Sequence, residues 1–435
     1  MIYKEHPLKK LVRQQKKGIP EGICSLCSSH PYVIEAGIEK AIAEDTYVLI
    51  ESTANQVNQF GGYIGMTPQS FASYVKETAV RKGLHEDRLI LGGDHLGPLV
   101  WKDETEGIAM RKAEELIAHY VKAGFSKIHI DTSMHLSSDP KDKKLDIKII
   151  ALRAAKLYLS AEKAFKEIES KEKYRPVYVI GSEVPIPGGA QENKDLKVTK
   201  VLDLDDTLNC FSETFTEKIS SSAMENVIAV VVQPGVEFGE GSIDEYNRES
   251  SQELSKYIKG EIGLVFEGHS TDYQRSTLLR QMVEDGIAIL KVGPALTFAL
   301  REGLYSLEYI EREMLRFSRN AKLSFFSDIL EEAMLKNPIY WKMYYNGSKN
   351  DIKIARKFSL SDRCRYYLGD NKVVESIESL IRNLSAVEIP LAILSQYLPQ
   401  QYAKIREGIL DNSVESIIKD KIRNVIDTYP QFSRV

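Results

Sequence analysis

The feature that most constrains the fold is a series of short, continuously apolar segments, each followed at once by polar residues. Unbroken apolar runs are typical of strands that are covered on both faces, and several of these are rich in the strand-favouring residues Val and Ile. We count eight runs: GICSLCSSHP (22–31), TYVLIESTANQ (46–56), RLILGGDHLGP (88–98), SKIHIDTSMH (126–135), VYVIGSEVPIPGG (177–189), VIAVVVQPGVE (227–237), GLVFEGHSTDY (263–273) and AILKVGPALT (288–297).

Amphipathic segments lie between the runs. Residues 107–124 and 146–174 place apolar side chains at helical spacing, and Gly124 gives the first of these a stop signal. Residues 70–83 and 276–286 show the same pattern. Eight strands that alternate with helices predict a (β/α)8 barrel. A doubly wound open sheet is the alternative, but the G-x-G-x-x-G loop that follows its first strand is missing.

The strand-like runs stop after about Gly303, and the rest of the chain has helical patterning. An aromatic and basic stretch, residues 340–372, interrupts these helices. We therefore divide the chain into a (β/α)8 barrel over residues 1–305 and a helical C-terminal region over residues 306–435.

Composition excludes several classes of protein. Hydrophobic residues make up 43% of the chain and its formal net charge is −4, with none of the basic stripes that nucleic-acid binding requires. No apolar run approaches the ~20 residues of a membrane span, and the basic N-terminus has no apolar signal core behind it, so we expect a cytoplasmic protein. Four cysteines do not make a disulfide framework, and Cys24 and Cys27 are read as small buried side chains.

The polar residues that follow the runs are the candidates for function, because barrel active sites lie at the C-terminal ends of the strands. His129 lies inside the fourth run, and we expect it to face away from Asp131 or to pack in the core. The residues selected in this way are Glu51, Asn55, Gln56, Gln59, Asp94, His95, Asp131, Glu183, Gln233, Glu267 and His269.

Several carboxylates cannot share one cleft unpaired without a large free-energy penalty, which a divalent cation removes. His95 and His269 supply the nitrogen ligands, and Glu183 or Glu267 an oxygen ligand, for zinc, manganese, cobalt or nickel. Asp94 and Glu183 are alternatively a general acid/base pair. A single strand-end aspartate often only caps the next helix, but the residues selected above follow six of the eight runs.

The loops after the seventh and eighth strands of a barrel often hold phosphate. Here Lys291 supplies a cation, as does Arg363 or Arg365 from the C-terminal region. The alternatives are that Lys291 pairs with a carboxylate and that the two arginines form an ordinary solvated face. Hydrogen-bond donors in these loops are Ser270, Thr271 and the backbone of Gly293.

Ten segments carry a family resemblance that extends, in unchanged order, over almost the entire chain. They are GICSLCSSHP, ESTANQVNQFGGYIGMTP, GGDHLGP, AGFSKIHIDTSM, GSEVPIPGG, VVQPGVEF, FEGHSTDYQ, LKVGPALTFALRE, FSLSDRCRYY and SQYLPQQ. They resemble the Z-type (GatZ/KbaZ-like) subunit family of class II tagatose-1,6-bisphosphate aldolase. The resemblance implies a class II aldolase-type barrel. It also implies either a non-catalytic partner of the catalytic Y-type subunit or, as for some relatives, a metal-dependent 4-epimerase.

The resemblance also implies roles for individual residues. Asp94 and His95 match the pair that moves a proton and binds zinc in catalytic class II aldolases, and His269 matches a further ligand. Where those enzymes have another histidine this chain has Glu183, which argues against ordinary aldolase activity. For an epimerase, Asp94 and Glu183 transfer protons while His95 and His269 hold the metal. Alternatively Glu183 is a ligand, and Glu51 or Asp131 takes the second acid/base role.

We therefore predict a metal-dependent ketose 4-epimerase that interconverts tagatose 6-phosphate and fructose 6-phosphate, or the free sugars, by retro-aldol chemistry. A subunit without chemistry has no physical need for so many charges in one cleft. The alternative is the non-catalytic aldolase subunit. A sugar kinase is disfavoured because a G-x-x-x-x-G-K-[ST] loop is missing. Expected partners are a small ketose or ketose phosphate, a second copy of the chain, and the catalytic aldolase subunit.

Overall fold

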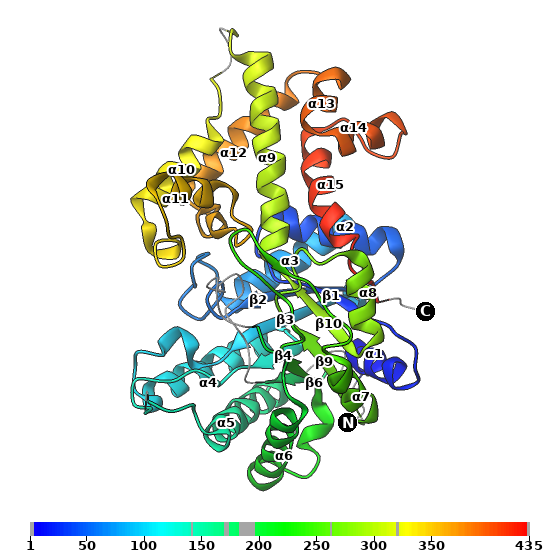
Figure 1. Cartoon of the computed structure of the whole chain (residues 1–435), viewed down its shortest axis with the longest axis vertical. Coiled ribbons are helices and arrows are strands. Elements are labelled where there is room, and N and C mark those ends of the chain that lie inside the picture. Colours follow the sequence, from blue (N-terminus) through cyan, green and yellow to red (C-terminus); the bar gives the residue numbers. More distant parts are fainter. Residues whose placement is uncertain are drawn as a thin grey trace.

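The computed structural model describes residues 4–140, 142–168, 174–181, 196–261, 263–318 and 322–432. Its central feature is a closed barrel of eight parallel strands, as the sequence predicts, in the spatial order β1-β2-β3-β4-β5-β6-β9-β10 (Figure 1). The strands are β1 (Ile23–Leu26), β2 (Val48–Thr53), β3 (Leu89–Leu96), β4 (Lys127–Ile130), β5 (Val177–Ile180), β6 (Val227–Val232), β9 (Val265–Gly268) and β10 (Ile287–Val292). A separate antiparallel pair consists of β7 (Glu237–Phe238) and β8 (Ile243–Asp244).

Helices follow the strands around the barrel. The side chain of Thr67 caps the start of α3, and Gly83 and Gly124 end α3 and α4 in the left-handed conformation that favours glycine. These helices are α2 (Pro31–Glu44), α3 (Pro68–Lys82), α4 (Glu106–Ala123), α5 (Ile147–Lys166), α6 (Val201–Lys218), α7 (Gln252–Gly260), α8 (Ser276–Glu284) and α9 (Pro294–Leu315).

The N-terminal end of the barrel is filled by apolar side chains. Helix α1 (Pro7–Lys16) contributes Leu8 and Leu11, which are buried with residues from the starts of the strands. Phe432, near the other end of the chain, joins the same cluster. Because this end is closed by apolar packing, the polar residues at the opposite, C-terminal ends of the strands form the accessible mouth.

The C-terminal region is helical, as the sequence predicts. Helix α9 runs across the expected boundary at residues 305 and 306, so one helix belongs to both the barrel and the C-terminal region (Figure 1). Helix α15 (Val414–Ile426) returns to pack against α2 and α9. No helix among the described residues has the length and apolar character needed to cross a membrane. The remaining helices are α10 (Phe326–Lys336), α11 (Lys349–Phe358), α12 (Asn371–Ser385), α13 (Leu391–Tyr397) and α14 (Pro399–Arg406).

Candidate metal centre and active site

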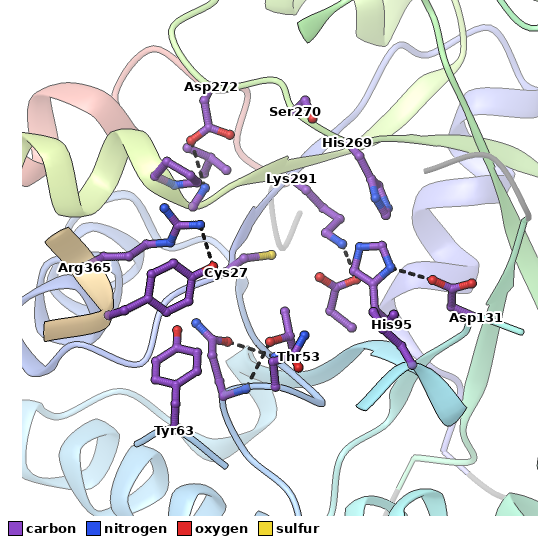
Figure 2. Close-up of a pocket in the computed structure, with 18 of the residues that line it drawn as sticks. Cys27, Thr53, Tyr63, His95, Asp131, His269, Ser270, Asp272, Lys291 and Arg365 are labelled. Carbon is purple, nitrogen blue, oxygen red and sulfur yellow. Dashed lines mark hydrogen bonds and ion pairs between the residues drawn. The ribbon is translucent and has the colours of Figure 1, made fainter. Parts of the chain in front are cut away.

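A pocket lies at the C-terminal ends of the strands, where the strand-end rule predicts the active site (Figure 2). It is bordered by the barrel and, on one side, by Arg365 and Tyr366 of the helical C-terminal region. The lining residues that the sequence predicts are Asn55, Gln56, Asp94, His95, Asp131, His269, Ser270, Lys291 and Gly293.

The end of β3 is irregular, and this irregularity positions two consecutive side chains in the site. Neighbouring residues on a regular strand face opposite sides. Here the pairing of β3 with β4 shifts between Gly93 and Leu96, and His95 has a φ of 47°. A non-glycine residue in this left-handed region carries backbone strain, which clusters at functional sites. The shift lets both Asp94 and His95 line the pocket.

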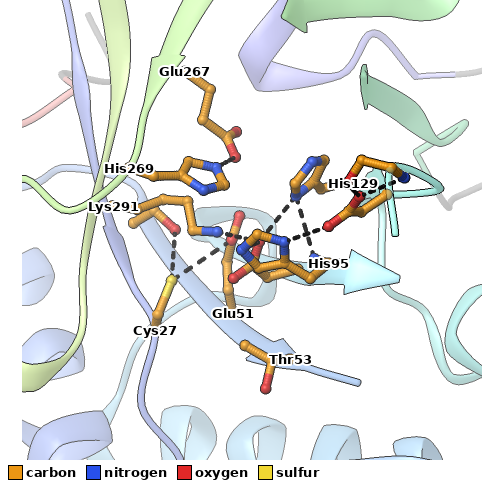
Figure 3. A network of polar contacts seen from close by, with 12 residues as sticks. Cys27, Glu51, Thr53, His95, His129, Glu267, His269 and Lys291 are labelled. Carbon is orange, nitrogen blue, oxygen red and sulfur yellow. Dashed lines mark hydrogen bonds and ion pairs between the residues drawn. The ribbon is translucent and has the colours of Figure 1, made fainter. Parts of the chain in front are cut away.

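The imidazole rings of His95, His129 and His269 converge (Figure 3). Asp94 lies close enough to share a metal ion with them. The ring centroids of His95 and His129 are 4.9 Å apart, and those of His95 and His269 are 5.0 Å apart. One potential ligand atom from each of these four residues lies within 4.8 Å of the others. One buried ring nitrogen of each histidine has no hydrogen-bond partner: Nε2 of His95, Nε2 of His129 and Nδ1 of His269. Burial lowers the pKa of His129 and of His269, which keeps both rings neutral as metal binding requires.

The place of His129 corrects the sequence-based expectation. His129 lies on β4 and contacts Asp94 through Nδ1 at 3.0 Å, so it belongs to the candidate metal centre. It does not face away from Asp131, because residues two apart on a strand share a face. The alternation of side chains along a strand, which places residues 129 and 131 on the same face, would have identified His129 as a site residue from the sequence alone.

Carboxylates hold two of the histidines in position. Asp131 Oδ2 lies 2.9 Å from His95 Nδ1, and Glu267 Oε1 lies 2.9 Å from His269 Nε2. A carboxylate that accepts the other ring N–H is the usual partner of a metal-binding histidine, because it fixes the tautomer and the ring orientation. Burial by itself raises the pKa of Asp131, but the hydrogen bond and charge of His95 outweigh it and hold that pKa below its usual range. Glu267 lies outside the four-residue group and orients His269.

The charges beneath the pocket point to a divalent cation. Lys127 is fully buried, with Nζ 2.6 Å from Glu51 Oε1 and 2.6 Å from Glu267 Oε2, and Lys291 forms an ion pair with Asp94. With Asp131, four buried carboxylates therefore face two ammonium groups. The carboxylates outnumber the ammonium groups by two, and a divalent cation would remove the penalty of burying unpaired carboxylates.

The residues present therefore fit a divalent metal ion. Three imidazole nitrogen ligands and a nearby carboxylate are a donor set that zinc and its neighbours in the first transition row accept. His95, His129 and His269 would hold the ion, and Asp94 lies beside it. Burial by itself raises the pKa of Asp94, but His95 and Lys291 hold that pKa well below its usual range, so the carboxyl is ionised.

Some predicted residues lie elsewhere. Gln59 donates its amide to a backbone carbonyl of α4, and Gln233 accepts backbone N–H groups of the loop after β6. The hydroxyl of Thr271 donates to the carbonyl of Lys291 at 2.7 Å. The Arg363 guanidinium lies over a tyrosine ring, outside the pocket. Glu183 falls outside the described residues.

Sequence reasoning missed several side chains. Cys27, Tyr63 and Asp272 line the pocket, and Lys127 anchors the charge network beneath it. Lys127 could have been identified from the sequence, because a lysine within the apolar run KIHID needs buried carboxylate partners. Arg365, one of the two arginines considered, reaches the pocket.

Fold and site together define a (β/α)8 barrel protein with a candidate divalent metal centre at the C-terminal ends of its strands. Residues 8–434 match the family model described as D-tagatose-1,6-bisphosphate aldolase subunit GatZ/KbaZ-like, and the chain belongs to this family.

Relatives of this family align along almost the whole chain. D-tagatose-1,6-bisphosphate aldolase subunit GatZ of Salmonella paratyphi B is 44% identical over 423 residues, which cover 97% of this chain and 98% of the relative. The subunit GatZ of Escherichia coli O1:K1 is 44% identical, with 97% and 99% covered. The crystal structure of a probable tagatose 6 phosphate kinase from Sinorhizobium meliloti 1021 has a TM-score of 0.85 and 40% identity, and the match covers 94% of this chain and 99% of that one.

Proposed function

We propose that this chain acts as a GatZ-type subunit of a tagatose-1,6-bisphosphate aldolase and supports a separate catalytic subunit. The observation that carries this proposal is the 44% identity to GatZ subunits over 97% of the chain. The alignment spans 423 residues and covers 98% of the relative, so the proposal rests on nearly the full length of both chains.

The test is co-expression with the catalytic subunit of a tagatose-1,6-bisphosphate aldolase. We expect the two chains to co-purify through a tag on either one, and the aldolase activity or thermal stability of the catalytic subunit to rise several-fold. A co-expressed barrel protein of another family serves as the control. A catalytic subunit that is equally active and stable without this chain would refute the subunit role.

A second function, ketose 4-epimerisation, is favoured by a different observation. The three histidines and Asp94 converge in a pocket, and buried carboxylates outnumber buried lysines around them. A subunit that only supports another chain does not need this costly arrangement. We therefore propose in addition that the pocket interconverts ketose or ketose 6-phosphate epimers at C4 with bound zinc, manganese, cobalt or nickel.

The proton at C4 of a 2-ketose is not acidic, so inversion proceeds through cleavage of the C3–C4 bond. A divalent cation at the cluster would stabilise the negative charge that develops on the C2 oxygen when cleavage leaves an enolate of C2 and C3. Asp94 takes the C4 hydroxyl proton as the bond breaks and C4 becomes an aldehyde. The aldehyde turns, C3 bonds to its other face, and Asp94 returns the proton to the C4 oxygen. Lys291, paired with Asp94, stabilises that oxygen in between.

The epimerase is tested with the purified chain alone. The protein is stripped with chelator, reloaded with each metal, and incubated with fructose 6-phosphate and with fructose. Metal-dependent tagatose 6-phosphate or tagatose, separated by chromatography, is the expected product, and Asp94→Asn should lower the rate by about 100-fold or more. Full activity of a well-folded Asp94→Asn variant would overturn the role of Asp94. No product with any metal would leave the subunit role alone standing.

A further inference from the structure

The position where barrels usually hold a phosphate is already filled by a side chain. That position is the N-terminus of the helix after the last strand, together with the adjoining loops. Here Asp272 Oδ1 accepts the backbone N–H of Gly293 at 3.0 Å and of Ala295 at 2.8 Å, at the start of α9. Asp272 is 2% exposed and lines the pocket, so its carboxylate takes the place of an external anion.

A phosphate at the start of α9 would also meet the negative charge of Asp272. Burial raises the pKa of this carboxyl to about 6, and a second anion beside it would cost further free energy. Lys291, the cation on β10, is paired with Asp94 in the centre of the site. The loops after β9 and β10 therefore offer no free cation, among the described residues, for an anionic group.

Arg365 is the other cationic side chain among the described residues that line the pocket. Its Nη1 donates to the carbonyls of Ser361 and Asp362 at 2.6 and 3.0 Å, and its Nη2 to the hydroxyl of Tyr366 at 3.0 Å. These acceptors are neutral, and Arg365 also interacts with the charges of Asp362 and Asp272. Although burial by itself lowers the pKa of Arg365, nearby tyrosines and Asp362 raise it, so the group stays charged.

The position of Arg365 suits one end of a bound sugar. Figure 2 shows Arg365 and Tyr63 on the side of the pocket away from Asp131 and His95. The rings of Tyr63 and Tyr366 pack edge to face at 5.0 Å and form a wall beside the guanidinium. A ketose whose carbonyl end is at the histidine cluster would therefore direct its other end toward Arg365.

We propose that Arg365 binds the anionic terminal group of an open-chain sugar substrate, a phosphate or a carboxylate, and that Asp272 keeps this group away from the N-terminus of α9. The inference rests on the proposed function in that it assumes a ketose in the pocket. It assigns the anion-binding residue to the helical C-terminal region, where the sequence offered Arg363 and Arg365 as candidate cations, rather than to the loops after β9 and β10. Arg365 thereby becomes the residue that distinguishes acidic sugars from neutral ones.

The test measures binding by calorimetry to the metal-loaded full chain, with fructose 6-phosphate, a keto-hexuronate, fructose and inorganic phosphate as probes. The variants are Arg365→Gln, Arg365→Lys and Asp272→Asn. Arg382→Gln, which removes an exposed charge on α12 outside the pocket, is the matched control. Unfolding temperatures verify that each variant is folded.

We expect the wild type to bind an acidic sugar at least tenfold more tightly than fructose, and Arg365→Gln to abolish this preference while fructose affinity stays within twofold. Arg365→Lys should retain part of the preference for an acidic sugar. Asp272→Asn should tighten phosphate binding several-fold. The stronger of the two acidic probes identifies the group as phosphate or carboxylate. Equal losses for acidic and neutral sugars in Arg365→Gln, or an unchanged preference, would overturn the inference.

Inorganic phosphate separates this inference from the proposed function. If the wild type binds no sugar, the ketose pocket is wrong, and phosphate affinity still tests Arg365. Phosphate binding that Arg365→Gln weakens at least tenfold, while Arg382→Gln leaves it unchanged, then supports an anion site at Arg365. Phosphate binding that is absent from the wild type, or unchanged in Arg365→Gln, refutes it.

Discussion

Replacing Lys127 by methionine tests the charge network beneath the pocket. Lys127 is the fully buried bridge between Glu51 and Glu267, at 2.6 Å from an oxygen of each. Burial by itself lowers the pKa of Lys127, but the two glutamates raise it, so the native lysine is charged. Lys127→Met keeps most of the side-chain volume and removes the charge, which leaves two carboxylates facing each other in a dry interior.

The expected cost follows from these contacts. Breaking a buried ion pair by removing one partner destabilises a protein by about 3–5 kcal/mol. Burial already raises the pKa of Glu51 in the native protein, so without Lys127 we expect Glu51 to take up a proton. Protonation limits the loss to one uncompensated carboxylate, about 3–5 kcal/mol near pH 8. Without Lys127 we expect the pKa values of Glu51 and Glu267 to be higher in the folded variant than in its unfolded chain. The loss of unfolding free energy should therefore shrink as the pH falls toward the unfolded-state pKa values.

The assay is urea unfolding of metal-free wild type and variant between pH 5 and pH 8. Metal affinity is a second readout: Glu267 orients His269, so Lys127→Met should weaken metal binding by about 10-fold to 100-fold. The triple variant Glu51→Gln, Lys127→Met, Glu267→Gln removes the charges together and should recover most of the stability. A Lys127→Met protein within about 1 kcal/mol of wild type at pH 8, or a triple variant as unstable as the single one, refutes the reasoning.

Three further predictions concern other parts of the molecule. His129→Ala should weaken zinc or cobalt binding at least tenfold, read by the absorption of bound cobalt, whereas a purely packing role would change only the unfolding temperature. Gly97→Ala should destabilise the barrel by more than about 2 kcal/mol in thermal unfolding, because the added Cβ would lie 1.7 Å from the carbonyl oxygen of Asp131; a normal melting temperature would contradict this. Glu39→Gln should cost up to about 1 kcal/mol at pH 7, since Glu39 contacts Lys419 of α15 at 2.6 Å. Burial by itself raises the pKa of Glu39, but its lysine partners lower it. The stabilisation by Glu39 is therefore complete above the ordinary glutamate pKa and is lost as the pH falls through the lowered pKa. Urea unfolding at pH 3 and pH 7 checks this direction, and a Glu39→Gln penalty that grows toward pH 3 would contradict it.

The barrel and the general place of its site follow from the sequence because both depend on local patterns. Continuous apolar runs predict covered parallel strands, and in a barrel all strand ends with their polar residues meet at one mouth. Asp94, His95, Asp131 and His269 could therefore be selected without knowledge of which strands are neighbours. The structure brings all four into the same pocket.

The identity of the remaining site residues was decided by tertiary structure, because it depends on irregular backbone and on contacts between distant segments. The left-handed His95 and the register shift after Gly93 direct two consecutive side chains into the site, which a period of two does not predict. Arg363 and Arg365 have the same local pattern, and only the packing of the C-terminal region on the barrel directs Arg365 to the pocket. The sequence by itself determined where chemistry is possible, while the tertiary structure decided which charges face one another, since ion pairing depends on distances that no local pattern specifies.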